Sequence, residues 1–226
     1  MTREKAIFDE WPEKYDLWFT TPIGSLVRKY ESEIILNFLN PAPGEIVLDA
    51  GCGTGVFTRD IISKGSKVTG LDISFPMLQR AREKAGGFSF HPVWGDISTL
   101  PFREESFDKV VSITALEFIA EAKAAVAELF RVVQRGGVVV VATLNSRSPW
   151  AERRKDEARK GHSIFSKAVL RSPDDLLSLS SVHGVVKTAI HFDKEDSPEE
   201  AMETEREGQT MGLMTGAFAA VRWLKP

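Results

Sequence analysis

The sequence predicts an α/β fold built on a parallel, doubly wound sheet. Three observations support this: apolar segments alternate with amphipathic ones, Pro and Gly separate them, and one apolar segment runs directly into a glycine-rich turn. That segment is 46–55, Ile-Val-Leu-Asp-Ala-Gly-Cys-Gly-Thr-Gly. Ligands of open α/β sheets bind beyond the carboxyl ends of the strands, so this turn is a candidate binding site.

The elements up to residue 144 follow from periodicity and from turn residues. A first helix is expected over 22–39, because Thr21 can cap it, Pro22 suits its first turn and apolar residues recur at every fourth position from Leu26. The expected strands are 46–50, 67–72, 88–94, 108–114 and 138–144. The expected helices between them are 55–63, 76–85 and 121–134.

Two of these strands have features that place them in the sheet. Pro92 cannot donate to a strand ladder, so 88–94 is expected at a sheet edge. The segment 138–144 is almost wholly apolar, as a central strand buried on both faces should be, and a turn at 135–137 precedes it. Beyond it the pattern loosens, with a polar and basic stretch, a charged stretch and three further expected elements. These are a helix at 174–181 and strands at 185–192 and 216–224.

Composition limits the class of protein. The chain has 226 residues, 42% hydrophobic and 27% charged, with a net charge of −3 that gives no global attraction to nucleic acid or anionic membranes. Its one cysteine excludes an internal disulfide, its first residues lack the apolar core of a signal peptide, and its longest apolar run is too short to span a bilayer. We expect one cytoplasmic domain, 1–226, with 1–40 as a helical cap and 145–175 as a candidate substrate lid.

The spacing of the glycines argues against a dinucleotide site. The dinucleotide fingerprint G-x-G-x-x-G has its third glycine five residues after the first. Here the third, Gly55, comes four residues after Gly51, and Val56 occupies the fingerprint position. A nicotinamide-dependent oxidoreductase is therefore disfavoured.

Acidic residues end successive strands next to this turn. Asp49, Asp72 and Asp96 lie at the carboxyl ends of the first three strands, and the segment 114–117 lies at that of the fourth, so all face one crevice. Asp72 lies 21 residues after Gly51, where an acid binds ribose hydroxyls, and Asp96 could accept from an adenine amino group. Such charge-assisted bonds contribute about 1.5–3 kcal/mol each. The pattern fits a nucleoside-like ligand without a pyrophosphate.

These motifs resemble those of a known family. The segments 49–55, 95–97 and 107–108, together with Asp72, look like the motifs of class I S-adenosylmethionine-dependent methyltransferases. The aromatic and acidic residues at 8–11, 15–16 and 18–19 resemble the small-molecule branch that includes quinone-biosynthesis methyltransferases. The resemblance implies a Rossmann-like, seven-stranded, mostly parallel sheet with a C-terminal antiparallel hairpin whose last strand lies beside the fifth. It also implies S-adenosylmethionine as cofactor, S-adenosylhomocysteine as product and a small-molecule acceptor.

The resemblance assigns cofactor contacts to thirteen residues. The methionine part is expected at Asp49 and the turn, the ribose at Asp72, the adenine at Asp96 and its neighbours, the sulfonium near Thr114, and an aromatic cover from the N-terminal segment. The full set is Tyr15, Trp18, Asp49, Gly51, Cys52, Gly53, Gly55, Asp72, Ile73, Met77, Asp96, Ile97 and Thr114.

Methyl transfer from a sulfonium is a direct displacement that needs no nucleophilic side chain. A base is required only for an acceptor protonated at working pH, and Glu117, His162 and Tyr15 are the candidates. Cys52 could be a catalytic thiol, but a small residue filling the turn is favoured. No pair of histidines has metal-ligand spacing, so no metal is expected.

Two other functions within the family stay open. An RNA or protein methyltransferase is disfavoured because Ile-Thr-Ala-Leu at 113–116 is not the Asn-Pro-Pro-Tyr type that gathers an exocyclic amine, and no RNA-binding module is added. The basic run 153–160 is a solvated helix face or a binder of an anionic substrate or RNA. A non-catalytic cofactor-binding module carries the same motifs. The sequence names neither the acceptor, the atom methylated nor the oligomeric state.

Overall fold

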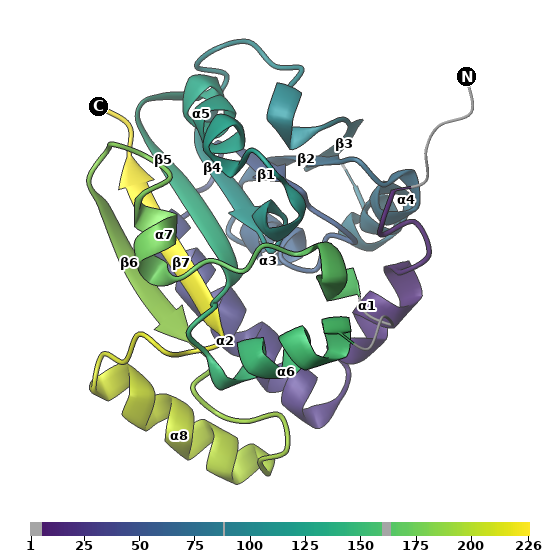
Figure 1. The fold of residues 1–226 in the computed structure, drawn as a ribbon. Helices are drawn as coiled ribbons and strands as arrows, with labels where there is room; N and C mark the ends of the chain where they lie inside the picture. Colours follow the sequence, from purple (N-terminus) through teal and green to yellow (C-terminus); the bar gives the residue numbers. More distant parts are fainter. Residues whose placement is uncertain (1–5, 88, 160–163) are drawn as a thin grey trace.

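The computed structural model describes residues 6–87, 89–159 and 164–226 (Figure 1). Within these ranges the chain forms a seven-stranded sheet in the order β3-β2-β1-β4-β5-β7-β6. The strands are β1 (Ile46–Ala50), β2 (Lys67–Asp72), β3 (Phe90–Trp94), β4 (Phe107–Ile113), β5 (Val133–Leu144), β6 (Gly184–Ala189) and β7 (Phe218–Leu224). The pairs among β1 to β5 are parallel, and β7 runs antiparallel to both β5 and β6. The doubly wound sheet, its C-terminal hairpin and the place of the last strand are confirmed.

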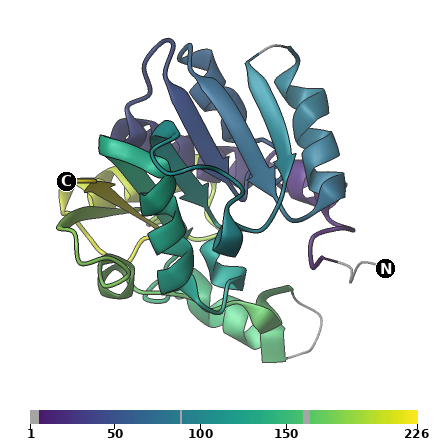
Figure 2. The ribbon, with the colours of Figure 1, turned by 90° about the horizontal axis from the view of Figure 1, so that it is seen from above.

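Helices cover both faces of the sheet (Figure 2). They are α1 (Pro12–Trp18), α2 (Pro22–Leu39), α3 (Thr58–Ser63), α4 (Phe75–Ala85), α5 (Ala122–Val132), α6 (Pro149–Arg159), α7 (Pro173–Leu177) and α8 (Pro198–Thr210). Three short 3₁₀ turns are η1 (Ile97–Thr99), η2 (Leu116–Phe118) and η3 (Ile164–Lys167). Helices α2, α3 and α8 pack in one core cluster, and α5 and α7 in another. No helix in the described ranges is long and apolar enough to cross a membrane.

The centre of the sheet shows why an unbroken apolar run is needed there. Along β5, Val138 and Val140 belong to the core on one face, whereas Val139 and Val141 belong to the core on the other. Side chains alternate between the faces of a strand, so a strand covered on both sides requires apolar residues at every position. The prediction of a central buried strand is confirmed.

Helix α2 has the bounds expected from the sequence. The Thr21 hydroxyl accepts a hydrogen bond from the backbone N–H of Gly24 at 3.0 Å, and Pro22 begins the helix. Strand β3, which contains Pro92, lies at the edge of the sheet as predicted.

Other boundaries differ because single residues adopt a left-handed backbone. The helix expected from residue 55 begins at Thr58, since Gly55 has φ of +75° and cannot continue a helix. The strand expected up to residue 192 ends at Ala189, since Ile190 has φ of +67°. The predicted turn at 135–137 is wrong: β5 starts at Val133 and passes through it. The N–H of Gly136 donates to the carbonyl of Lys225, beyond β7, and the N–H of Lys225 donates to the carbonyl of Gly137, each at 2.9 Å, and these bonds hold the segment in the sheet.

Helices α1 and α8 were not predicted as separate elements. A signal for α8 exists, because Ser197 and Glu200 form a capping box in which the Ser197 hydroxyl accepts from the Glu200 N–H at 3.3 Å. The many charges of this segment lie on a helix whose residue Ala201 packs in the core.

Candidate cofactor cavity

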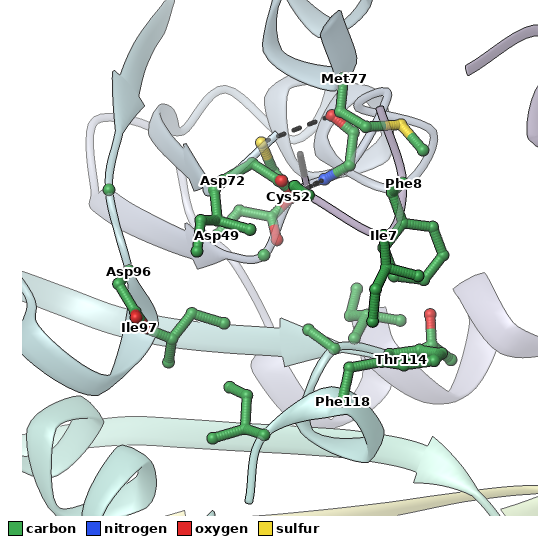
Figure 3. Close-up of a pocket in the computed structure, with 18 of the residues that line it drawn as sticks. Ile7, Phe8, Asp49, Cys52, Asp72, Met77, Asp96, Ile97, Thr114 and Phe118 are labelled. Carbon is green, nitrogen blue, oxygen red and sulfur yellow. Dashed lines mark hydrogen bonds between the residues drawn. The ribbon is translucent and has the colours of Figure 1, made fainter. Parts of the chain in front are cut away.

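A cavity of about 560 Å³ opens beyond the carboxyl ends of the parallel strands, next to the glycine turn (Figure 3). This volume lies within the range of about 300–1,000 Å³ that small-ligand pockets occupy. Eleven of the thirteen predicted cofactor residues line it. They are Tyr15, Asp49, Gly51, Cys52, Gly53, Asp72, Ile73, Met77, Asp96, Ile97 and Thr114.

The other two, Gly55 and Trp18, do not line this cavity. Gly55 faces helix α4, where an added Cβ would lie 3.1 Å from the Cβ of Ala81, so its small size serves the packing of turn against helix. Trp18 lies edge-to-face with Trp150, with ring centroids 6.5 Å apart, and the ammonium of Lys194 sits over its ring. The structure thus brings neither side chain to the cavity.

The glycine turn presents bare backbone to the cavity. Gly51 has φ of +81°, and a Cβ there would lie 2.5 Å from the Cβ of Ala115, so no larger residue fits between the turn and the end of β4. Gly53 has φ of +54°, and a Cβ there would meet nothing within 4 Å. A side chain at Gly53 would project into open space at the cavity, whereas glycine leaves its amide backbone within reach of a ligand.

Asp72 ties the end of β2 to this turn. Its two carboxylate oxygens accept from the N–H groups of Gly53 and Ser74, each at 2.8 Å. Burial raises the pKa of Asp72, and these backbone bonds oppose the rise. Each oxygen has a second lone pair, so the carboxylate can still accept from ligand hydroxyls in the cavity.

The neighbouring wall is formed by residues of β1 and of the segments after β2 and β3. Asp96 caps η1 by accepting from the N–H of Ser98 at 2.8 Å, and Ile97 beside it is buried. Ile73 is 50% exposed, an unusual state for an isoleucine, and lies on the cavity wall together with the buried Met77. Apolar side chains can pack against the faces of a flat heterocycle, while a neighbouring carboxylate accepts hydrogen bonds from its polar edge.

Burial shifts the protonation of two groups, Asp49 at the end of β1 and Cys52 in the turn, towards their neutral forms. Burial raises the pKa of Asp49 to about 7, although the Thr58 hydroxyl donates to it at 2.6 Å. Burial and the nearby Asp49 and Asp72 raise the pKa of the Cys52 thiol. Because the thiolate is the reactive form, this environment suits a packing residue and not a nucleophile.

Thr114 and Tyr15 meet at the end of β4. Thr114 has φ of +48°, a conformation that is strained for a β-branched residue and is common at functional sites. The Tyr15 hydroxyl lies near the Thr114 side chain, and the Tyr15 ring packs edge-to-face on Phe19. Burial raises the pKa of Tyr15, so the phenol stays protonated at neutral pH.

Glu117, a candidate base, lies behind the cavity wall. Its side chain is fully buried and does not line the cavity, and its Oε1 accepts from the N–H of Leu144 at 2.6 Å. Burial raises its pKa to about 7. The η2 turn directs Phe118 to the cavity and Glu117 towards β5. His162, another candidate base, lies outside the described residues.

Some lining residues were not predicted from the sequence. The N-terminal residues 6–8 and the segment 118–121 complete the cavity, and the rings of Phe8 and Phe118 meet edge-to-face with centroids 4.8 Å apart. Phe8 belongs to an aromatic segment that resembles the methyltransferase family, which was the available signal. For Phe118 no motif existed.

The charges on the cavity wall are all of one sign. Among the described lining residues, Asp49, Asp72, Asp96 and Glu121 are acidic, and no Lys, Arg or His is present. Such a wall favours a ligand with positive charge and disfavours an anion. Within the described part of the chain, no group of three or more His, Cys, Asp or Glu side chains could hold a metal ion.

Three of the basic residues of α6 form ion pairs with acidic side chains. Arg153 pairs with Asp193 at 2.9 Å, and Lys155 and Arg159 pair with acids on their own helix at 2.7 and 2.9 Å. Arg154 is instead half-buried between the rings of Trp150 and Phe165, 5.4 Å from each centroid. This helix face therefore does not present a row of free cations over its described residues.

Comparison with known proteins gives a consistent result. Residues 48–141 match a family model described as a methyltransferase domain. The chain is 31% identical over 191 residues to the malonyl-[acyl-carrier protein] O-methyltransferase of Salmonella typhimurium. The matched region covers 75% of this chain and 75% of that protein. It is 33% identical over 137 residues to the demethylmenaquinone methyltransferase of Renibacterium salmoninarum, covering 61% of this chain and 56% of that protein. The structure of an S-adenosylmethionine-dependent methyltransferase from Thermotoga maritima shares the fold, with a TM-score of 0.72 at 21% identity over 97% of this chain and 99% of that one.

Proposed function

Because this chain belongs to the class I S-adenosylmethionine-dependent methyltransferases, we propose that its cavity binds the cofactor against the glycine turn and directs the methyl group towards a small, largely apolar acceptor. The enzyme class and the cofactor follow from the family. The cofactor's orientation, the acceptor's chemistry and the residue roles are the proposal.

The sign of the charge on the cavity wall carries the proposal. S-adenosylmethionine carries a positively charged sulfonium, and the described residues that line the cavity include four acids but no Lys, Arg or His. The backbone exposed at Gly53 and the remaining lone pairs of Asp72 fit the same ligand, because an amino acid and a ribose both need hydrogen-bonding groups at close range.

The residue roles follow the order of the strands. Asp49 and the turn around Gly51 and Gly53 would hold the methionine part, and Asp72 the ribose hydroxyls. Ile73 and Met77 would pack against the adenine, with Asp96 and Ile97 at its edge. Thr114 and Tyr15 would lie at the sulfonium end. Gly55 and Cys52 would act by allowing the turn to pack.

The bound cofactor supplies an electrophilic methyl group, and the protein supplies orientation and electrostatics. Holding the two reactants in line can remove roughly 7–11 kcal/mol of the barrier. Tyr15, whose pKa is raised by burial, stays protonated and serves as a hydrogen-bond donor and cover, not as a base. We assign no general base to a described residue.

The acceptor side of the cavity is mainly apolar, with Glu121 at the end of its lining segment. Phe8, Phe118 and Ile119 lie there, and a carboxylate or phosphate acceptor would find no described cation on the wall to pair with. The two relatives are named for different classes of acceptor. One acts on a malonyl group carried by acyl-carrier protein, and the other acts on demethylmenaquinone. The cavity supports a neutral ring acceptor over a small anion.

Titration calorimetry of the purified protein with S-adenosylmethionine and S-adenosylhomocysteine tests the cofactor site. Methyl transfer is then measured with isotopically labelled cofactor and two sets of acceptors, hydroxylated naphthalene rings and malonyl thioesters. We expect both cofactor forms to bind and label to enter the ring compounds. Transfer to the malonyl thioesters alone would overturn the acceptor class, and absence of cofactor binding would overturn the site.

A further inference from the structure

Asp16 fastens the N-terminal helix to the body of the enzyme. Its Oδ1 accepts from the hydroxyl of Thr54 at 2.6 Å and from the ammonium of Lys84, and its Oδ2 accepts from Nε of Arg80 at 2.9 Å. Lys84 also donates to the Thr54 hydroxyl at 3.0 Å. One carboxylate thus joins α1 to two separate elements.

Both elements belong to the cofactor site. Thr54 is fully buried within the glycine turn, between Gly53 and Gly55. Arg80 and Lys84 lie on α4, the helix that carries Met77 on the cavity wall. The position of α1 is therefore set by contacts with the same two elements that are proposed to hold the methionine and adenine parts of the cofactor.

The segment fastened in this way covers the cavity. Residues 6–8 and Tyr15 line it, and Figure 3 shows Ile7 and Phe8 across the cavity from Asp96 and Ile97. A second contact, from the hydroxyl of Ser74 to Asp9 at 2.7 Å, holds the start of the segment near the N-terminus of α4. With the segment in this position, a ligand in the cavity is enclosed from that side.

The electrostatics make Asp16 the central group of this contact. Burial tends to raise its pKa, but hydrogen bonds from Lys84, Thr54 and Arg80 outweigh it and hold the pKa below the usual value for aspartate. The carboxylate is thus ionised at neutral pH. Without its charge, the partly buried Lys84 would lose its carboxylate partner and Arg80 would keep only Glu83, so the attraction that holds α1 to α4 would be weakened.

We propose that Asp16 is a positioning residue that latches the N-terminal segment over the cofactor cavity, so that S-adenosylmethionine binds and S-adenosylhomocysteine leaves when the Asp16 contacts open. The proposal rests on the proposed function for the identity of the ligand. The latch itself is a property of the free protein and can be measured without a ligand.

Asp16→Asn is the test variant, and Asp60→Asn is the matched control. Asp60 also accepts from an arginine and a hydroxyl, Arg28 at 2.7 Å and Ser32 at 2.6 Å, and it ties α2 to α3. None of these three residues lines the cavity. In both variants a half-buried carboxylate that accepts charge-assisted hydrogen bonds from another helix is replaced by a neutral amide. The loss in the free energy of unfolding should therefore be similar in the two.

Hydrogen–deuterium exchange of the ligand-free proteins reports on the latch. We expect Asp16→Asn to raise exchange over residues 12–19 by roughly tenfold or more, while Asp60→Asn leaves that segment near the wild-type rate. Asp16→Glu, which keeps the charge, should restore part of the protection. Equal exchange of this segment in all the proteins, or equal loss in both Asn variants, would overturn the latch.

Release of S-adenosylhomocysteine, followed by stopped-flow fluorescence of the tryptophans in and beside α1, gives the functional readout. Dissociation should be roughly 10- to 100-fold faster in Asp16→Asn than in Asp60→Asn, because loss of a buried charge pair acts mainly on the dissociation rate. An unchanged dissociation rate would overturn the gating role. If the wild-type protein binds no cofactor, the proposed function is wrong. The latch is still tested in that case, because hydrogen–deuterium exchange is measured on the ligand-free protein.

Discussion

The two walls of the cavity are built by different means. One wall consists of the glycine turn and the acids that end β1, β2 and β3, and its side chains bond to backbone groups, as Asp72 does with Gly53. The opposite wall consists of the N-terminal residues and the segment after β4, where aromatic contacts such as Phe8 on Phe118 dominate. The first wall is fixed by backbone geometry and the second by side-chain packing. Substitutions should therefore be tolerated less in the first than in the second.

The largest effect is expected from Gly51→Ala in the glycine turn. The new Cβ would lie 2.5 Å from the Cβ of Ala115, at a backbone angle that disfavours a side chain. We expect a loss of roughly 2–4 kcal/mol in the free energy of unfolding and loss of cofactor binding. Denaturant unfolding and calorimetry measure both.

Gly44→Ala is the control for backbone strain alone, since Gly44 has φ of +85° and a Cβ there would meet nothing within 4 Å. It should cost about 1 kcal/mol and leave cofactor affinity intact. If Gly51→Ala behaved like this control, the backbone-built wall would not be the rigid one.

Asp72→Asn is the next test of the same wall. The amide keeps one acceptor oxygen, so one of the backbone N–H groups now bonded to Asp72 loses its partner and the site loses a negative charge. We expect the cofactor dissociation constant to rise roughly 10- to 100-fold, since charged hydrogen bonds contribute about 1.5–3 kcal/mol each.

Asp108→Asn is the matched control, because Asp108 also accepts from a backbone N–H, that of Ile46 at 2.7 Å, and does not line the cavity. Its cofactor affinity should remain near that of the wild type. A comparable loss in both variants would show that the effect is one of general stability.

Glu31→Gln tests a buried acid on α2 that interacts electrostatically with Glu117, behind the second wall. Burial raises the pKa of Glu31 from 4.5 to about 8, with Arg154 opposing and Glu117 adding to the rise. Between these pH values the folded protein keeps a proton that the unfolded chain has lost, so stability falls as pH rises through this window and is then constant. The variant should be more stable at pH 8 by roughly 1–3 kcal/mol and should show a flatter profile.

Chemical denaturation at several pH values measures this profile. At pH 4 and below the glutamate is protonated in both states, so wild type and variant should differ little there. A variant less stable than the wild type at pH 8 would contradict the expected cost of the buried carboxylate.

The smallest effect is expected at the surface of α6. Arg153 pairs with Asp193, with 44% and 37% of the two side chains exposed, and solvent-exposed pairs contribute at most about 1 kcal/mol. Arg153→Ala should change the unfolding midpoint slightly and leave methyl transfer to a ring acceptor unchanged. A large fall in turnover would instead assign this basic helix a role in substrate binding.

The contrast between the walls also explains how far the sequence could predict the molecule. The turn around Gly51, the strand ends and the order of the sheet were predictable, because glycine angles and strand-end acids are local features with a fixed meaning. Phe118 and the latch at Asp16 were not, because they depend on which helix meets which across the cavity. Glu117 shows the same limit: the sequence places it just after β4, but the η2 turn sets the direction of its side chain, which bonds to β5 and not to the cavity.

Helix α8 was missed for a different reason. Its segment was interpreted only as highly charged, although the capping box at Ser197 is a local signal that indicates the start of a helix. The wrong turn at 135–137 lay beyond local reasoning, because the backbone of Lys225, nearly ninety residues away in the sequence, holds it as strand.

The position of β7 has a consequence for how the chain is made. This strand follows β5 and β6 in the sequence, yet it pairs with β5 on one side and β6 on the other. During synthesis from the N-terminus, β5 and β6 therefore each keep an unpaired edge until residues 218–224 have left the ribosome, and such edges promote aggregation. The nascent chain is expected to be most prone to aggregation in the interval between the emergence of β5 and that of β7.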